Sequence, residues 1–311
     1  MFVFEKEQYV YNIGGIKIGG NPGEVATALA GTIFYDGHKI VEDPVEGIFD
    51  RAKSEALINK QDEMSDITGN PTIIQVVAES PKAIVRYLDF VSEISEAPII
   101  IDSGSPDVRI AGLEHSEETG LLDRVIYNSI NISIGDDEIS RLREIQHECA
   151  IILAFNPQDP SIAGRRTVLE EGALELKQGL LSLSEQLGVT KPLIDTAITP
   201  LGAGAGSSVA FTFVAKTLYG FPVGSGIHNL PSSWPWLKKF KKVNKEAYRV
   251  CDVASNPIAQ MLGANFLLYG PIKSAERVFP VVAMADVITA ESMKLEFGVE
   301  PSDTHPYRKL L

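Results

Sequence analysis

Cysteine is scarce in this sequence, which contains only Cys149 and Cys251 in 311 residues. Two distant cysteines cannot build the disulfide framework of a secreted protein, and they match no metal-binding spacing. We therefore expect no metal on this chain and two buried, inert thiols. A run of about 18 apolar residues is also absent, as is the apolar core of a signal peptide. These absences predict a cytoplasmic protein without direct membrane insertion.

Basic side chains are also in the minority. The chain has 28 Lys and Arg against 41 Asp and Glu, which gives a formal net charge of -13. A nucleic-acid-binding domain carries a basic face, and docking onto anionic lipid also needs positive charge. The charge balance therefore argues against both kinds of partner. The one basic cluster, residues 238–242, is interpreted as a solvated helix face.

Buried strands are the strongest positive signal in the sequence. Hydrophobic residues make up 44% of the chain, enough for a sizeable core. Three β-branched runs without polar alternation are typical of strands buried on both faces of a parallel sheet. They cover residues 99–101, 125–127 and 151–155. Each run is followed or ended by a short polar residue: Asp102, Asn128 and Asn156.

Strands and helices alternate along the whole chain, which indicates βαβ units. The eight predicted strands cover residues 28–34, 72–77, 99–102, 125–128, 151–156, 193–196, 222–225 and 266–269. The predicted helices cover 49–68, 106–119, 136–145, 164–187, 209–219 and 274–297, with one starting at Pro81 and broken helical segments over 234–262. This rhythm predicts an α/β fold, a (β/α)8 TIM barrel that forms a single domain over residues 1–311.

Two terminal segments stand outside the barrel rhythm. Two short apolar runs joined by Gly14 and Gly15 predict an N-terminal β-hairpin within residues 1–22, placed to plug the bottom of the barrel. Residues 298–311 form a polar, proline-containing tail that we expect to cover either the barrel bottom or a neighbour.

Polar residues at the C-terminal ends of barrel strands predict the active site. Asp102, Asn128 and Asp195 hold such positions, and Asn156 is expected to share the same pocket floor. Two carboxylates and an amide match the donor and acceptor edge of a pterin ring, because a carboxylate accepts two donors while an amide both donates and accepts. Each residue alone could instead cap the helix that follows it.

The segment after the seventh strand is a second candidate. Gly226 allows the backbone to approach a flat ligand, and Asn229 would then point into the pocket or serve as a turn residue. His228 is interpreted as a structural histidine. The glycine-rich segment 202–208 lacks the Lys-Ser/Thr of a phosphate-binding loop, so it is interpreted as a helix-capping loop or a lid.

The sequence resembles the MtrH family of tetrahydromethanopterin S-methyltransferase subunits, within the wider group of pterin-dependent methyltransferases. The motifs that carry the resemblance extend over nearly the whole chain. They are residues 31–35, 37–40, 63–66, 68–71, 101–103, 127–131, 154–157, 199–202, 222–229 and 268–271. Residues 105–115 and 202–208 differ from the family pattern, which leaves open a paralogue with another partner.

The resemblance implies transfer of the N5 methyl group of methyl-tetrahydromethanopterin to cobalt(I) of a corrinoid (cobalamin) on a partner subunit. It implies that Asp102, Asn128 and Asp195 hold the pterin and that Asn229 lies near N5. It also implies a homodimer within a complex that reaches the membrane through other subunits. Tetrahydrofolate remains an alternative pterin, and a non-catalytic scaffold is a further alternative. Dihydropteroate synthase ranks low, because residues 224–229 and 266–271 offer no basic side chain for pyrophosphate.

Overall fold

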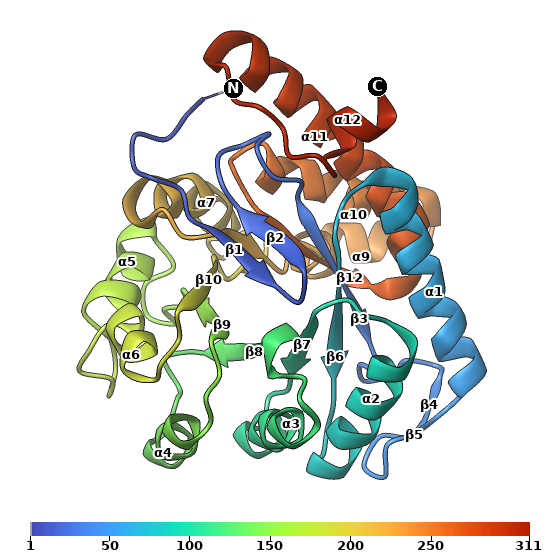
Figure 1. The fold of residues 1–311 in the computed structure, drawn as a ribbon, viewed down its shortest axis with the longest axis vertical. Helices are drawn as coiled ribbons and strands as arrows, with labels where there is room; N and C mark the ends of the chain where they lie inside the picture. The colour runs from blue at the N-terminus through green and yellow to red at the C-terminus, as the bar shows by residue number, and fades with distance from the viewer. Residues whose placement is uncertain (1) are drawn as a thin grey trace.

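Eight parallel strands close into a barrel in the computed structural model, which describes residues 2–311 (Figure 1). The order of the strands around the barrel follows their order along the chain, and the last strand, β12, pairs with the first, β3, to close it. In sequence they are β3 (Ala28–Ile33), β6 (Thr72–Val77), β7 (Ile99–Asp102), β8 (Val125–Ile130), β9 (Cys149–Leu153), β10 (Lys191–Asp195), β11 (Val223–Ser225) and β12 (Phe266–Pro271). The predicted TIM barrel is confirmed.

Helices surround the barrel and cover its outer face (Figure 1). They are α1 (Arg51–Thr68), α2 (Pro81–Ile94), α3 (Pro106–Thr119), α4 (Asp136–Glu144), α5 (Ile162–Glu170), α6 (Leu180–Gln186), α7 (Ala205–Tyr219), α8 (Asn229–Ser232), α9 (Pro235–Phe240), α10 (Lys245–Gln260), α11 (Ala275–Phe297) and α12 (Pro306–Leu310). Local signals set several ends: the Asp50 side chain caps α1, and Ser80 caps α2 with Pro81 at its first position. No helix within residues 2–311 is long and apolar enough to cross a membrane.

The N-terminal hairpin closes the bottom of the barrel, as predicted. It consists of β1 (Val10–Ile13) and β2 (Ile16–Gly19), joined by Gly14 and Gly15, whose φ angles of 52° and 84° suit glycine. Ile13 and Ile18 are fully buried and pack with the lowest inward-facing side chains of the barrel, such as Ile73. The hairpin therefore completes the core at the end opposite the strand C-termini.

Two connections differ from the prediction. The helix predicted over residues 164–187 is divided into α5 and α6, because Gly172 adopts a φ of 92° and a side chain there would collide with the Leu176 carbonyl oxygen. The connection after β3 contains an unpredicted pair of strands, β4 (Val41–Asp43) and β5 (Ile48–Phe49). Phe49 packs edge-on against the Phe34 and Tyr87 rings, which ties this pair to α2.

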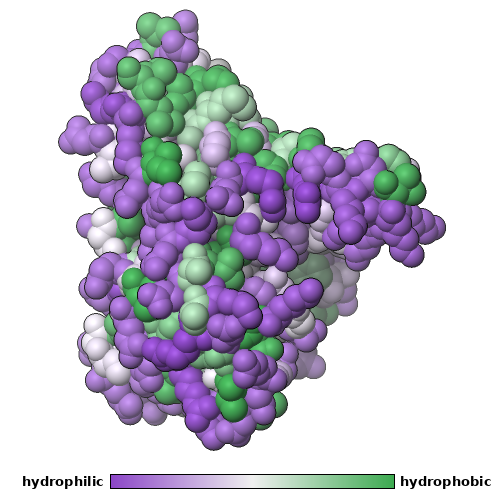
Figure 2. All heavy atoms as spheres, turned by 90° about the vertical axis from the view of Figure 1, so that its right-hand side faces the viewer, coloured by the Kyte–Doolittle hydropathy of each residue, from purple (hydrophilic) through white to green (hydrophobic). Residues whose placement is uncertain are grey.

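Both chain termini lie at the same end of the molecule (Figure 1). Helix α12 packs against α1 and α11, and the Ser302 amide donates to the Glu24 carbonyl oxygen at 2.8 Å. The tail thus lies against its own chain near the N-terminal segment. Below that end, an arm projects sideways from the body of the molecule, at the height of α9 and α10 in Figure 1 (Figure 2). Lysines 238, 239, 241 and 242 are exposed there, in agreement with a solvated helix face.

Candidate active site

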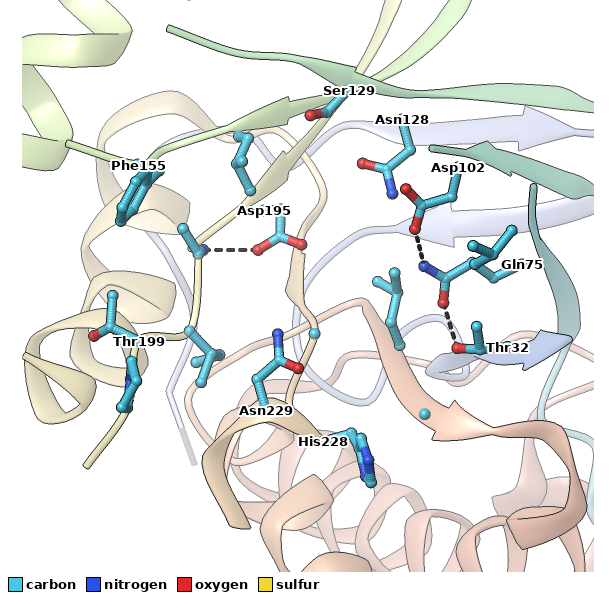
Figure 3. Close-up of a pocket in the computed structure, with 18 residues that line it drawn as sticks. Thr32, Gln75, Asp102, Asn128, Ser129, Phe155, Asp195, Thr199, His228 and Asn229 are labelled. Carbon is cyan, nitrogen blue, oxygen red and sulfur yellow. Dashed lines mark hydrogen bonds between the residues drawn. The ribbon is translucent and has the colours of Figure 1, made fainter. Parts of the chain in front are cut away.

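A pocket of about 590 Å³ lies at the C-terminal mouth of the barrel (Figure 3). Most of its lining side chains are uncharged or acidic, and none of the described residues that line it is a lysine or arginine. The polar residues in its wall are Thr32, Gln75, Asp102, Asn128, Ser129, Asp195, Thr199, His228 and Asn229. Five of the six residues expected at the site line this pocket: Asp102, Asn128, Asp195, Gly226 and Asn229.

Strand register explains why the predicted side chains converge. Side chains alternate between the two faces of a strand, so Ile100 and Asp102 both point into the barrel, as do Ile126 and Asn128. Asp102 and Asn128 are also direct partners across β7 and β8. The apolar members of each pair fill the barrel interior, and the polar members form the next layer, at the mouth.

Asp102 is held by a short chain of side chains from neighbouring strands. Nε2 of Gln75 donates to Oδ2 of Asp102 at 2.5 Å, and Oγ1 of Thr32 donates to Oε1 of Gln75 at 2.6 Å (Figure 3). Burial raises the pKa of Asp102, while the hydrogen bond from Gln75, the Arg109 charge and the Asn128 amide oppose that rise. These hydrogen bonds fix the Asp102 carboxylate and leave it with lone pairs that can accept further hydrogen bonds in the pocket.

Asp195 lies on the other side of the pocket and is only 7% exposed. Its Oδ1 accepts a hydrogen bond from the Ala197 amide at 2.7 Å. Burial raises the pKa of Asp195 to about 6; the Ala197 and Gly226 amides partly offset that rise, and the Asp102 charge adds to it. Two partly desolvated carboxylates in one pocket favour a ligand that brings hydrogen-bond donors.

Gly226 and Asn229 shape a third wall. A Cβ atom at Gly226 would lie 3.2 Å from Nδ2 of Asn229, so the glycine leaves room for the amide. Asn229 is the first residue of α8, and its side chain points toward the centre of the pocket, on the same side as Asp195 (Figure 3). The amide therefore lies near Asp195 and faces Asp102 across a space that a flat ring could occupy.

Asn156 does not line the pocket, contrary to the expectation that it shares the floor. Leu153 and Phe155 face the pocket. Because successive side chains of an extended segment point in opposite directions, Asn156 points away from it. Oδ1 of Asn156 accepts hydrogen bonds from the Gln158 and Asp159 amides, and Nδ2 donates to the Gly164 carbonyl oxygen. Asn156 is buried and holds the loop that leads into α5.

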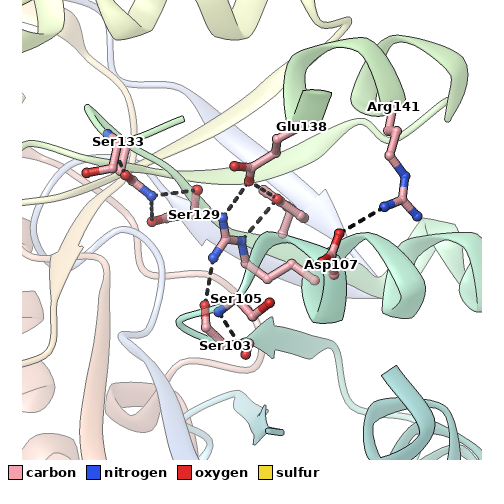
Figure 4. Close-up of polar contacts among 10 residues, drawn as sticks. Ser103, Ser105, Asp107, Ser129, Ser133, Glu138 and Arg141 are labelled. Carbon is pink, nitrogen blue, oxygen red and sulfur yellow. Dashed lines mark hydrogen bonds and ion pairs between the residues drawn. The ribbon is translucent and has the colours of Figure 1, made fainter. Parts of the chain in front are cut away.

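The carboxyl ends of β7 and β8 are supported from outside the barrel by a buried ion pair (Figure 4). Nη2 of Arg109 in α3 lies 2.5 Å from Oε1 of Glu138 in α4, and Nη1 of Arg109 donates to the Ser103 carbonyl oxygen at 2.7 Å. The hydroxyl of Tyr127 also donates to Glu138. This network anchors the residues next to Asp102 and Asn128.

Several pocket residues are not predicted by the sequence patterns. Gln75 carries a usable signal, because it is the only polar residue inside the apolar run 73–77. His228, expected to be a structural histidine, lines the pocket and pairs with Asp252. Thr199 and Ser129 offer no such signal, since short hydroxyl residues are common in loops and strand ends.

Neither a metal-binding cluster nor a cysteine is found in this pocket among the described residues. Within residues 2–311 the structure brings together no group of three or more His, Cys, Asp or Glu side chains suited to a metal ion. Cys149 on β9 is buried as predicted, whereas Cys251 on α10 is half-buried, so the prediction of a buried thiol there is wrong. Neither cysteine lines the pocket.

Comparison with known proteins gives a family match over most of the chain. The family model described as "Tetrahydromethanopterin S-methyltransferase MtrH subunit" matches residues 6–302. The chain is 51% identical to the H subunit of tetrahydromethanopterin S-methyltransferase from Methanothermobacter thermautotrophicus over 311 residues and to that from Methanocaldococcus jannaschii over 320 residues. It is 48% identical to the H subunit of the putative methyltransferase mtx from Methanosarcina barkeri over 311 residues. Each alignment covers 100% of both chains.

Solved structures with the same fold are much more distant in sequence. The dihydropteroate synthase of Yersinia pestis in a sulfonamide complex aligns with a TM-score of 0.63 and 9% identity, covering 91% of this chain and 100% of that chain. The dihydropteroate synthase of Xanthomonas albilineans with 7,8-dihydropteroate aligns with a TM-score of 0.59 and 13% identity, covering 90% and 98%. At such low identity the likeness concerns the barrel architecture alone.

Proposed function

The chain belongs to the MtrH family of tetrahydromethanopterin S-methyltransferase subunits, and we propose that the pocket at the mouth of its barrel binds methyl-tetrahydromethanopterin and orients it for loss of the N5 methyl group. The protein is a methyltransferase subunit. The observation that carries the assignment of the pocket is the convergence of Asp102, Asn128 and Asp195 on one cavity. These residues are proposed to bind the substrate.

The donor and acceptor pattern of the pocket supports this substrate. A reduced pterin presents an amino group and a ring N–H as donors, and ring atoms that accept hydrogen bonds. Asp102 and Asp195 are acceptors when ionised, and the Asn128 amide can donate and accept. Gln75 and the Ala197 amide already fill one position on each carboxylate, which leaves other lone pairs directed to the ligand.

The chemistry assigned to this chain is orientation and charge stabilisation. A tertiary amine leaves poorly unless its nitrogen is protonated or strongly hydrogen-bonded, whereas cobalt(I) of a corrinoid is a strong nucleophile. We propose that a partner subunit supplies the corrinoid as the methyl acceptor, and that Asn229 stabilises the charge change at N5 through a hydrogen bond. Because the pocket opens at the strand C-termini, the partner must approach the face on which α8 and the segment 197–200 lie.

Assembly into a homodimer is also part of the proposal. Apolar side chains are exposed on three helices that follow the last three barrel strands: Phe213 on α7, Ile258 on α10, and Met284 and Ile288 on α11. An apolar surface on consecutive helices is typical of an interface between protein chains. A second copy of the chain would cover it while leaving the barrel mouth open to the methyl acceptor.

One other function has support from a specific observation, and a second is disfavoured by the pocket lining. The relatives named for the putative methyltransferase mtx are almost as similar as those named for tetrahydromethanopterin S-methyltransferase, so a paralogue with another corrinoid partner or with tetrahydrofolate as its pterin is the second candidate. A dihydropteroate synthase would need cations for pyrophosphate, and the described pocket lining offers none.

Calorimetric titration of the purified chain tests the proposal. Methyl-tetrahydromethanopterin and methyl-tetrahydrofolate are titrated separately into the wild type, Asp102→Asn, Asp195→Asn and the surface control Asp303→Asn. We expect the wild type and control to bind the first pterin, and each pocket variant to bind it at least ~10-fold more weakly. Equal binding by all four proteins would place the pterin elsewhere. Tighter binding of methyl-tetrahydrofolate would favour the second candidate.

A further inference from the structure

A histidine–aspartate pair lies at the edge of the pocket, next to Asn229. Nδ1 of His228 donates a hydrogen bond to Oδ1 of Asp252 over 2.7 Å. His228 directly precedes α8 and Asp252 lies in the middle of α10, so the pair joins two separate elements. Their side chains are only 22% and 14% exposed. A carboxylate in this position fixes the tautomer and the orientation of the imidazole ring.

Strand β12 leaves space for the His228 imidazole at Gly270. A Cβ atom at Gly270, near the end of β12, would lie 2.4 Å from Cγ of His228, and Gly270 has a φ of 86°. Glycine adopts this backbone conformation without strain, and because it has no side chain it leaves the space that the His228 ring occupies. His228 and Gly270 both line the pocket, and Figure 3 shows His228 beside Asn229 on the pocket wall. The ring is therefore held against the cavity and not packed inside the core.

The second ring nitrogen remains available to a ligand. Within residues 2–311, the His228 side chain forms its one hydrogen bond through Nδ1, and Nε2 is not among the buried atoms that lack a partner. Since Nδ1 is committed to Asp252, any proton on Nε2 can be exchanged with a molecule in the pocket or with water. This is the arrangement of a general acid whose orientation is set by a carboxylate.

We propose that His228, held by Asp252, delivers the proton that the pterin N5 atom requires as its methyl group leaves. The inference rests on the proposed function. The bond between N5 and the methyl carbon breaks, and a bond forms between that carbon and cobalt, which supplies the electron pair and passes from cobalt(I) to cobalt(III). The Nε2 proton of the imidazolium moves to N5, which ends as N5–H. The neutral imidazole then takes a proton from water.

The other polar groups around the pocket are less suited to this step. Asn229 can hydrogen-bond to N5 but has no proton to give up at neutral pH. Asp102 and Asp195 are needed as carboxylates to accept donors from the pterin ring. Burial raises the pKa of Asp195 to about 6, so Asp195 is a second candidate for the proton donor. The two candidates are separable, because loss of Asp195 should weaken pterin binding whereas loss of His228 should leave it intact.

The test separates binding from transfer. The wild type, His228→Ala, His228→Gln and Asp252→Asn are compared with His115→Ala. The control removes a matched pair on the outer surface, in which Nε2 of His115 lies 2.6 Å from Oδ1 of Asp89. Methyl-tetrahydromethanopterin binding is measured by calorimetry, and single-turnover transfer to free cob(I)alamin is followed by absorbance. Transfer by His228→Ala is repeated with imidazole and with pyrazole, a similar ring that is a much weaker base.

We expect both His228 variants to bind the pterin within about threefold of the wild type and to transfer the methyl group about 10²-fold more slowly. Imidazole should raise the transfer rate of His228→Ala at least tenfold, and pyrazole should not. Asp252→Asn should be slowed about tenfold, and His115→Ala should match the wild type. If His228→Ala transfers normally, or loses binding and rate together without rescue, the proposal is wrong while the proposed function stands. If the wild type itself neither binds nor transfers, the proposed function fails and this inference with it.

Discussion

Gln75 and Asp102 are joined across two neighbouring barrel strands by a hydrogen bond of 2.5 Å between Nε2 and Oδ2. The bond holds the carboxylate in the pocket and opposes the rise in its pKa that burial causes. Gln75 in turn accepts a hydrogen bond from Thr32, so its amide orientation is fixed. Three strands, β3, β6 and β7, therefore cooperate to present one carboxylate.

Replacing Gln75 with leucine should weaken pterin binding, although Gln75 is not among the residues proposed to bind the pterin. The leucine removes the donor that favours ionised Asp102, so the pKa of Asp102 rises further and less of the carboxylate form is available. We expect the Kd for methyl-tetrahydromethanopterin at pH 7 to rise about tenfold, which corresponds to the loss of one charge-assisted hydrogen bond. Calorimetry measures the change. An unchanged Kd would mean that Asp102 does not contact the ligand.

The pH dependence of binding should report Asp195. Its pKa in the free protein is about 6, and its proposed partner is a donor that requires the carboxylate. Below pH 6 the free protein holds a proton that must leave before the pterin binds, so the affinity falls as the pH decreases, by up to about tenfold per pH unit. Above about pH 7 the affinity should level off.

Proton release gives an independent measurement of the same effect. Titrations at pH 6 in buffers of different ionisation enthalpy should detect protons released on binding, and fewer at pH 8. Asp195→Asn should bind weakly and lose most of the release at pH 6. Proton uptake on binding would have the opposite sign and would show that protonated Asp195 is the form that recognises the ligand.

Asn229→Ala should slow methyl transfer more than it weakens binding. The amide is proposed to interact with N5 as charge changes there, and removing one donor that acts in the transition state typically lowers the rate by about 10²-fold. Single-turnover transfer to cob(I)alamin and calorimetric binding together separate the two effects. A rate loss matched by an equal loss of affinity would assign Asn229 to substrate binding.

Much of the barrel and its mouth could be predicted because repeated local signals agree. The β-branched runs predict buried strands, and a polar residue at the end of each run predicts which side chains face the mouth. Asn156 shows the limit: whether a residue beyond a strand end faces inward depends on one step of alternation, and that step is decided by the loop into α5. Gly172 shows a second limit: the helix predicted over residues 164–187 is broken there by close backbone packing, which the spacing of apolar residues does not predict.

The pairing of His228 with Asp252 could not be predicted for a different reason. The two residues are 24 positions apart in the chain, and the packing of α8 against α10 brings them together. A histidine after a glycine-rich strand end is common in both structural and functional settings. Only the three-dimensional packing shows which nitrogen is engaged and which remains available.

The Arg109–Glu138 pair should make a large contribution to stability, because both side chains are buried. Their exposed fractions are 6% and 3%, and Oε2 of Glu138 has no partner within the described residues. Arg109→Met would leave the carboxylate buried without its cation, which typically costs about 3–5 kcal/mol of folding free energy. Arg141→Met is the matched control, since Arg141 pairs at the surface with Asp107 (Figure 4) and with Glu114. Its loss should cost less than about 1 kcal/mol.

Urea denaturation of the two variants and the wild type measures both free energies. Arg109→Met should also bind the pterin more weakly under conditions in which it is folded. It loses the hydrogen bond to the Ser103 carbonyl oxygen and the positive charge that helps to keep Asp102 ionised. If Arg109→Met is as stable as Arg141→Met, the buried pair contributes no more than an exposed one. If it is destabilised but binds normally, the ion pair supports the fold without tuning the pocket.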